Sequence, residues 1–125
     1  MNEEVKQLFY KGVDSFNAKD YYDAHEYFEE MWTEHKLEDR LFIQALIQLS
    51  VAYFHISNFN KNGAIGLFKK TLSKLNKYVD HTKLIININD VIKSAEISYE
   101  SVIKINDIST FNWSLAPVLQ IEDEK

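Results

Sequence analysis

The sequence predicts an all-helical protein built from packed helical hairpins. Apolar residues recur at three- and four-residue spacing along most of the chain, which is the spacing of one face of an α-helix. Only three glycines and one proline occur among 125 residues, so the turn residues that a sandwich or barrel of short strands needs are missing. This length with 46% hydrophobic residues is typical of one domain with one buried core. We therefore expect a single helical domain over residues 1–125.

Two helical hairpins are expected over residues 3–79. Residues 3–18 carry one apolar stripe, and residues 21–35 are amphipathic, with carboxylates on the outer side. Residues 39–59 are apolar on nearly every side, which predicts a central helix with neighbours around it. Residues 63–79 return to a clean pattern, with Ala64, Leu67, Phe68, Leu72, Leu75 and Tyr78 inward and Lys69, Lys70, Lys74 and Lys77 outward.

The chain after residue 79 is less regular. Leu84, Ile85, Ile86 and Ile88 have strand-like propensity, but no partner strand is evident, so we expect a loop. Asn89 can cap a fifth helix of about residues 89–106. The tail, 107–125, ends acidic and is expected to be extended, with three side chains docked on the helices: Phe111, Trp113 and Leu115.

The two hairpins align with each other at an offset of 40 residues, as from Phe9 to Leu49. The other matched pairs are Gly12 with Ala52, Phe16 with Ile56, Ala24 with Ala64, and Phe28 with Phe68. Small residues let two helices approach closely, and large apolar residues fill the space beside them, as in tetratricopeptide-like hairpins. Any two amphipathic hairpins can give such a pattern, so the alignment favours paired hairpins and leaves common ancestry open.

Charge and composition exclude several classes of function. The formal charge of -5 argues against nucleic-acid binding, which depends on clustered lysine and arginine. No cysteine occurs, so disulfides, thiolate nucleophiles and cysteine metal sites are excluded. The acidic start does not resemble a signal peptide, and the apolar stretch 41–59 holds too many polar residues for a membrane span. We expect a soluble cytoplasmic protein that binds no membrane and, without a glycine-rich phosphate loop, no cofactor.

Polar residues interrupt the apolar surfaces of the second and third helices. A helical projection places His25 and Glu29 inside the apolar arc of the second helix, beside Trp32. On the third helix the spacings of four, four and seven residues place one polar stripe on a single side: Arg40, Gln44, Gln48 and His55. Since an unpaired buried polar group costs about 1 to 3 kcal/mol, we expect the two stripes to face each other and to share hydrogen bonds.

Arg40 is the only arginine beside thirteen lysines. It lies in the first turn of its helix, where the helix dipole disfavours a cation. Its planar group suits bidentate pairing with a carboxylate such as Glu29, or with a bound anion.

These residues carry a family resemblance. The run YYDAHEYFEEMW from Tyr21 to Trp32, then RLFIQALIQ from Arg40 to Gln48, then His55, Asn60, Gly63 and Ala64, resembles the bacterial and plastid family called domain of unknown function 309. Its pattern is approximately F-[FY]-E-A-H-E-x-[WL]-E-x-x-W, then R-x-[FL]-[LI]-Q-G-L-I-Q, then H, G-N and G-A. The resemblance is specific over residues 20–64, and the Ile88 to Ile92 region and Pro117 fit later segments loosely.

The family pattern has glycine where this chain has Ala45 and Phe59, and neither change removes a reactive group. The resemblance implies an all-helical bundle and supplies no established activity. It carries over seven motif positions as candidate ligand-binding residues: His25, Glu29, Trp32, Arg40, Gln44, Gln48 and His55.

Several kinds of chemistry are compatible with this set. The start of a zinc-protease helix is similar to His25-Glu26-x-x-Glu29, but that motif needs a second histidine, which this chain lacks. A metal site could still form from imidazole and carboxylate ligands, which suit zinc, manganese or iron, at His25, Glu29 and His55. His25 and Glu29 form a candidate catalytic base pair, but Ser50 and Ser57 lie across the third helix from the polar stripe. The simplest alternative is a structural hydrogen-bond network. Likewise, the outward lysines form a solvated face or, with Lys61, a surface for an acidic partner.

The sequence thus predicts a small binding or interaction module with a polar pocket between the second and third helices. Its partner is an unidentified small ligand or protein, and the oligomeric state is open. The alternative is a small hydrolase or metal-dependent enzyme that uses the same histidine and glutamate.

Overall fold

The computed structural model describes residues 2–37, 39–80 and 86–122. Within these ranges the chain forms α1 (Glu3–Asn17), α2 (Tyr21–Glu34), α3 (Arg40–Ser57), α4 (Lys61–Leu75) and α5 (Ile88–Lys104), with short 3-10 turns η1 (Asn76–Tyr78), η2 (Ile108–Thr110) and η3 (Trp113–Leu115). The predicted all-helical fold is confirmed, since no strand occurs in the part of the chain described. None of these helices is both long and apolar enough to cross a bilayer.

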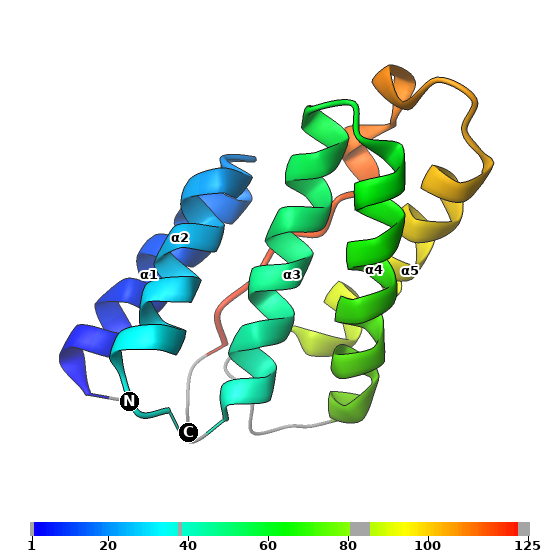
Figure 1. Cartoon of the computed structure of the whole chain (residues 1–125). Helices are drawn as coiled ribbons and strands as arrows, with labels where there is room; N and C mark the ends of the chain where they lie inside the picture. Colours follow the sequence, from blue (N-terminus) through cyan, green and yellow to red (C-terminus); the bar gives the residue numbers. More distant parts are fainter. Residues whose placement is uncertain (1, 38, 81–85, 123–125) are drawn as a thin grey trace.

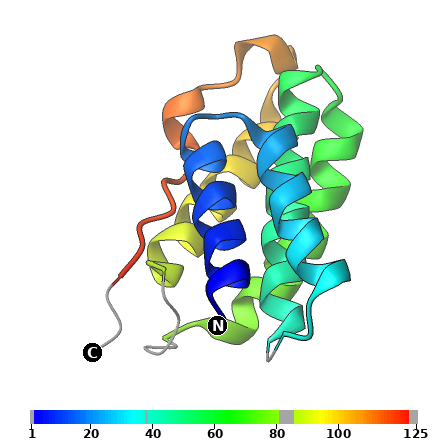
Figure 2. The ribbon, with the colours of Figure 1, turned by 90° about the vertical axis from the view of Figure 1, so that its left-hand side faces the viewer.

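The helices form two layers. Helices α2, α3 and α4 lie side by side in one layer, and α1, the C-terminal tail and α5 lie behind it (Figures 1 and 2). The tail runs behind α3, where the Asn17 side chain of α1 bonds both the N–H and the carbonyl of Leu119, at 2.8 and 2.9 Å. One side of α3 therefore faces the core, and its other side faces outward between α2 and α4.

The two hairpins turn in the same way. The backbone N–H of Asp20 donates to Ser15 at 2.8 Å, and that of Asn60 donates to His55 at 2.8 Å. The preceding residues, Lys19 and Phe59, have positive φ angles of 64° and 59°. This left-handed conformation favours glycine, which explains physically why glycine suits the position of Phe59.

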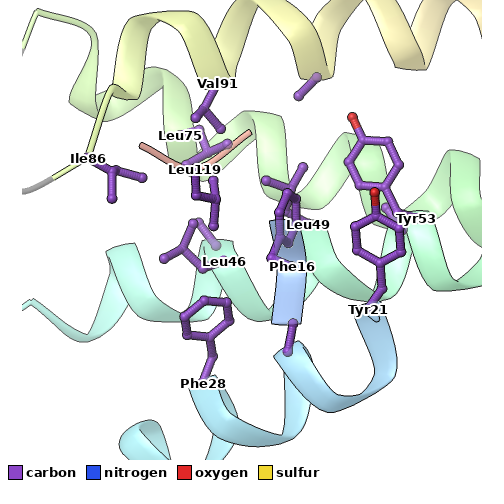
Figure 3. Close-up of a cluster of buried hydrophobic side chains, with 14 of the residues drawn as sticks. Phe16, Tyr21, Phe28, Leu46, Leu49, Tyr53, Leu75, Ile86, Val91 and Leu119 are labelled. Atoms are coloured by element: carbon purple, nitrogen blue, oxygen red, sulfur yellow. The ribbon is translucent and has the colours of Figure 1, made fainter. Parts of the chain in front are cut away.

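Close contact between α1 and α2 depends on Gly12. A Cβ atom added there would lie 2.5 Å from Cε1 of Phe28, so only glycine lets the two helices approach this closely. The core continues from Phe28 through Leu46, Leu49 and Tyr53 of α3 to α4, α5 and Leu119 of the tail (Figure 3).

Aromatic residues of the tail complete the core, as the sequence predicts. Phe111 is buried, and Trp113 stacks on Tyr21 with ring centroids 5.8 Å apart. Tyr53 donates a buried hydrogen bond to Ser98 of α5, at 2.8 Å. Leu115 is half-buried against the same core.

The fifth helix begins before the predicted cap. It starts at Ile88, and the Asn89 side chain bonds Asp80 instead, accepting from its N–H at 2.9 Å and donating to its carboxylate at 3.0 Å. The prediction of Asn89 as the cap is therefore wrong. Ile86 forms a single antiparallel bridge with Ile121 of the tail, so its apolar character serves a long-range contact. Leu84 and Ile85 lie outside the described residues.

Candidate functional site

The candidate site lies on the outward side of α3. We call this surface the outer face; its α3 residues are Arg40, Gln44, Ile47, Gln48, Val51, Phe54 and His55, which recur at helical spacing. Arg40 is exposed and the other six are half-buried, whereas Leu46, Leu49 and Tyr53 on the opposite side are fully buried. The outer face therefore mixes polar groups with accessible apolar groups. The sequence prediction included its polar members and omitted Ile47, Val51 and Phe54, although the same spacing places them there.

Two ring contacts join α2 to the outer face. At one end, the Arg40 guanidinium lies 4.2 Å from the centroid of the Trp32 ring, and its Nη1 donates to the Trp32 carbonyl at 2.8 Å. At the other end, the rings of Tyr22 and Phe54 are 5.4 Å apart. Because α2 and α3 are antiparallel, these contacts bracket His25 and Glu29 between them.

His25 is satisfied within its own helix. Its Nδ1 lies 2.6 Å from the Tyr22 carbonyl, and its Nε2 lies 3.4 Å from Oε2 of Glu29. A general base needs a nitrogen lone pair free to accept a proton from a substrate. Both ring nitrogens face oxygen atoms of α2 here, so this arrangement orients the imidazole within its own helix.

The predicted hydrogen bonds between the two polar stripes are not formed. Among the described residues, the side chains of His25 and Glu29 make no hydrogen bond to Gln44 or Gln48. Instead, Oε1 of Gln48 and Nε1 of Trp32 are buried without a hydrogen-bond partner in the protein. The stripes remain separate because His25 takes its partners from one turn before and one turn after it on α2.

Arg40 also departs from its predicted partner. The described residues contain two ion pairs, His25 with Glu29 and His35 with Glu4, and neither includes Arg40. Its planar group stacks on the Trp32 ring, so the position exploits the flat shape of arginine for a cation–π contact.

The three candidate metal ligands do not come together. His55 lies on the α4 side of α3, where its Nδ1 is 3.3 Å from Nδ2 of Asn60. A Cβ atom added at Gly63 would lie 3.0 Å from its ring. Within the described chain, no three histidine or acidic side chains are placed to hold a metal ion. The hypothesis of a site made of His25, Glu29 and His55 is therefore not supported by their positions.

No serine near the outer face is arranged as a nucleophile. Ser50 is fully buried and donates to the Leu46 carbonyl at 2.8 Å, and Ser57 donates to the Phe54 carbonyl at 2.6 Å. Both hydroxyl groups are thus used within α3.

Charges of opposite sign flank the outer face. Helix α2 carries Asp23, Glu26, Glu29, Glu30 and Glu34 with no lysine or arginine, and α4 carries Lys61, Lys69, Lys70 and Lys74 with no acidic residue. The pKa of Tyr22 is raised by a hydrogen bond to Glu26 and by the charge of that carboxylate. Lys61 is not part of the predicted lysine surface, because its Nζ donates a hydrogen bond to the Ile105 carbonyl at 2.6 Å.

A cavity of about 290 Å³ lies away from the outer face. Its walls are Asp80, residues 86–90 and Glu122, where the start of α5 meets the tail. This cavity does not coincide with the polar pocket predicted between α2 and α3.

Comparison with known proteins supports the resemblance that the motifs indicate. No curated protein and no solved structure matches the chain. Residues 9–67 match the model of the family described as Domain of unknown function (DUF309). This segment contains the α1–α2 turn, all of α3 and every motif residue from Tyr21 to Ala64. The resemblance to the DUF309 family is therefore confirmed over residues 9–67, the segment that forms the outer face and its acidic flank.

Proposed function

We propose that this chain is a binding module that holds its partner on the outer face. The observation that carries this proposal is the pair of buried polar atoms without partners, Oε1 of Gln48 and Nε1 of Trp32. A buried polar group without a hydrogen bond costs about 1 to 3 kcal/mol. A ligand that supplies the missing hydrogen bond recovers this free energy on binding.

The neighbouring side chains suit a partner of mixed character. Ile47, Val51 and Phe54 supply half-buried apolar surface beside the Gln48 amide. An amide or peptide group offers both a donor and an acceptor, and its substituents can cover the apolar residues. Rotation of the flexible Gln48 side chain brings its amide to the surface, where the ligand replaces the lost packing.

Titration with small N-acetyl amino-acid amides, followed by nuclear magnetic resonance, tests this function. We expect shifts in the Trp32 indole N–H and the Gln48 side-chain amide, and weaker binding by Gln48→Leu. The indole of Trp113 is a built-in control, because it stacks on Tyr21 near the tail. Shifts confined to Trp113 or to the cavity near Asn87 would contradict binding on the outer face.

The geometry provides no observation that favours the alternative enzyme. In the described residues both His25 nitrogens are engaged, and the nearby serine hydroxyls bond within their own helix. A cytoplasmic location and the lack of nucleic-acid binding stay predictions of the sequence. Cell fractionation and a DNA-binding titration at physiological salt would check them.

A further inference from the structure

The outer face is self-complementary in charge. The two flanks lie on opposite sides of α3, the acidic one on α2 and the basic one on α4 (Figure 1). A partner that covers all three helices must present a basic strip to α2 and an acidic strip to α4, separated by the width of α3. The chain itself carries these two strips at that spacing.

Glu29 and Lys70 lie at the same height on opposite flanks. Glu29 is one turn before Trp32, and Gln44 is one turn after Arg40, which stacks on Trp32. Thr71 donates to the Ala45 carbonyl at 2.7 Å, so Lys70 also lies level with Gln44.

Both side chains belong to the surface that faces outward. The Glu29 side chain is 53% exposed and lies seven residues after Tyr22, whose ring contacts Phe54 of the outer face. Lys70 is exposed and lies seven residues after Gly63, which adjoins His55. Seven residues are close to two helical turns, so each pair shares one side of its helix.

We propose that the partner of the outer face is a second copy of this chain, related by a two-fold axis parallel to α3. This inference rests on the binding function proposed above. This axis places α2 of each copy over α4 of the other copy. Glu29 of each copy therefore meets Lys70 of its partner. An axis perpendicular to α3 would place α2 over α2 and bring like charges together.

The composition of the surface matches a protein interface. Ile47, Val51 and Phe54 form an apolar centre, and charged residues of α2 and α4 form the rim. Rim charges determine orientation and association rate more than total affinity. We therefore expect a reversible dimer that weakens as salt is added.

The test measures mass by sedimentation equilibrium for the whole chain at low salt and at concentrations up to about 1 mM, the range of weak interfaces. We expect the mass to level off at two copies. Glu29→Lys and Lys70→Glu should each weaken self-association by at least about tenfold, because each places like charges at both symmetric contacts.

Mixing the two single variants provides the decisive measurement. In the mixed dimer every contact at these positions again joins opposite charges, so association should return to the level of the unchanged chain. Lys93→Glu and Glu96→Lys on α5 are matched controls, because both residues are exposed and lie outside the outer face. Circular dichroism of each variant shows that it is folded.

Four outcomes would overturn the dimer: a single-copy mass throughout, continued growth beyond two copies, single variants as associated as the unchanged chain, or no recovery on mixing. None of these four outcomes affects the amide titration, because the shift of the Trp32 indole is measured in dilute protein. Loss of that shift with an intact charge-dependent dimer would instead contradict the amide-binding function and keep the dimer.

Discussion

The α1–α2 and α3–α4 hairpins share a backbone turn but differ in the residues that form it. In the second turn, the Asn60 side chain accepts from the N–H of Gly63 at 2.9 Å, whereas Asp20 at the equivalent place makes no side-chain capping bond. The first hairpin has Gly12 against Phe28 at its helix contact. The second has Ala52, and its Phe68 packs edge-on against Tyr53 at 5.2 Å.

The difference shows that one backbone geometry tolerates different side-chain solutions. In the first hairpin a glycine allows the close approach of two helices. In the second hairpin an amide caps the helix start. The helices α2 and α4 also carry opposite charges, which distinguish their exposed surfaces.

The largest expected effect concerns Gly12. We predict that Gly12→Ala lowers the free energy of unfolding by about 2 kcal/mol, because the new methyl group overlaps the buried Phe28 ring. Gly66→Ala is the matched control in the second hairpin: nothing lies within 4 Å of the added Cβ, so the better helix propensity should stabilise by up to about 1 kcal/mol. Urea denaturation measures both. Equal effects of the two substitutions would refute the close contact.

Next in size is the helix cap. Asn60→Ala should cost about 1 kcal/mol, because it removes the acceptor for the N–H of Gly63. Asp20→Ala should change stability little, because Asp20 makes no side-chain capping bond. Thermal unfolding of both variants checks the asymmetry, and a greater loss for Asp20→Ala would reverse our comparison of the two turns.

A smaller gain is expected at the left-handed residues. Phe59→Gly and Lys19→Gly should each stabilise the chain by about 0.5 to 1 kcal/mol, because the strain of a positive φ exceeds the added entropy of the unfolded state. Phe59 is 66% exposed, so little burial is lost. Asn58→Gly is the control, since its φ of −98° suits any residue; it should destabilise. A gain at position 58 equal to that at position 59 would show that backbone strain is not the cause.

The smallest effect is the pH dependence of the first turn. The pKa of Asp23 is raised above its ordinary 3.8, first by a hydrogen bond with Asp20 and then by the charge of that carboxylate. The protonated Asp23 carboxyl therefore stabilises the fold fully below pH 3.8, and this contribution is lost as the pH rises through the raised pKa. Asp23→Asn should therefore raise the melting temperature slightly at neutral pH and leave it unchanged in acid. The equivalent position in the second hairpin is Gly63, which carries no charge.

Salt provides the control for this last prediction. The advantage of Asp23→Asn should shrink as ionic strength rises, because Asp20 and Asp23 are both exposed. A difference in melting temperature that is constant from acid to neutral pH would mean that repulsion between these two carboxylates is not its origin.

Local patterns predicted most of the helices. The stripe from Val5 to Phe16 follows directly from helical spacing and is buried as expected. The nearly all-apolar α3 is a helix as predicted, but it is buried on one side only, so the expectation of neighbours all around it was wrong. The predicted start of α5 was wrong by one residue and its cap was misassigned, because the side chains of Asn87 and Asn89 bond residues outside the helix. The Asn87 side chain accepts from the N–H of Gln120 at 2.8 Å, a contact between residues 33 apart in the sequence.

The sequence by itself determined which polar residues share one side of α3, because spacings of four and seven residues are a property of one helix. It did not determine that this side faces outward. Only the tertiary structure decided what those residues contact. His25 bonds its own helix, Arg40 stacks on Trp32, and His55 turns toward α4. Helical periodicity specifies the side of a helix on which a residue lies, but hydrogen bonds and ion pairs depend on distances between helices. Those distances are determined by core packing, such as the contact of Gly12 with Phe28.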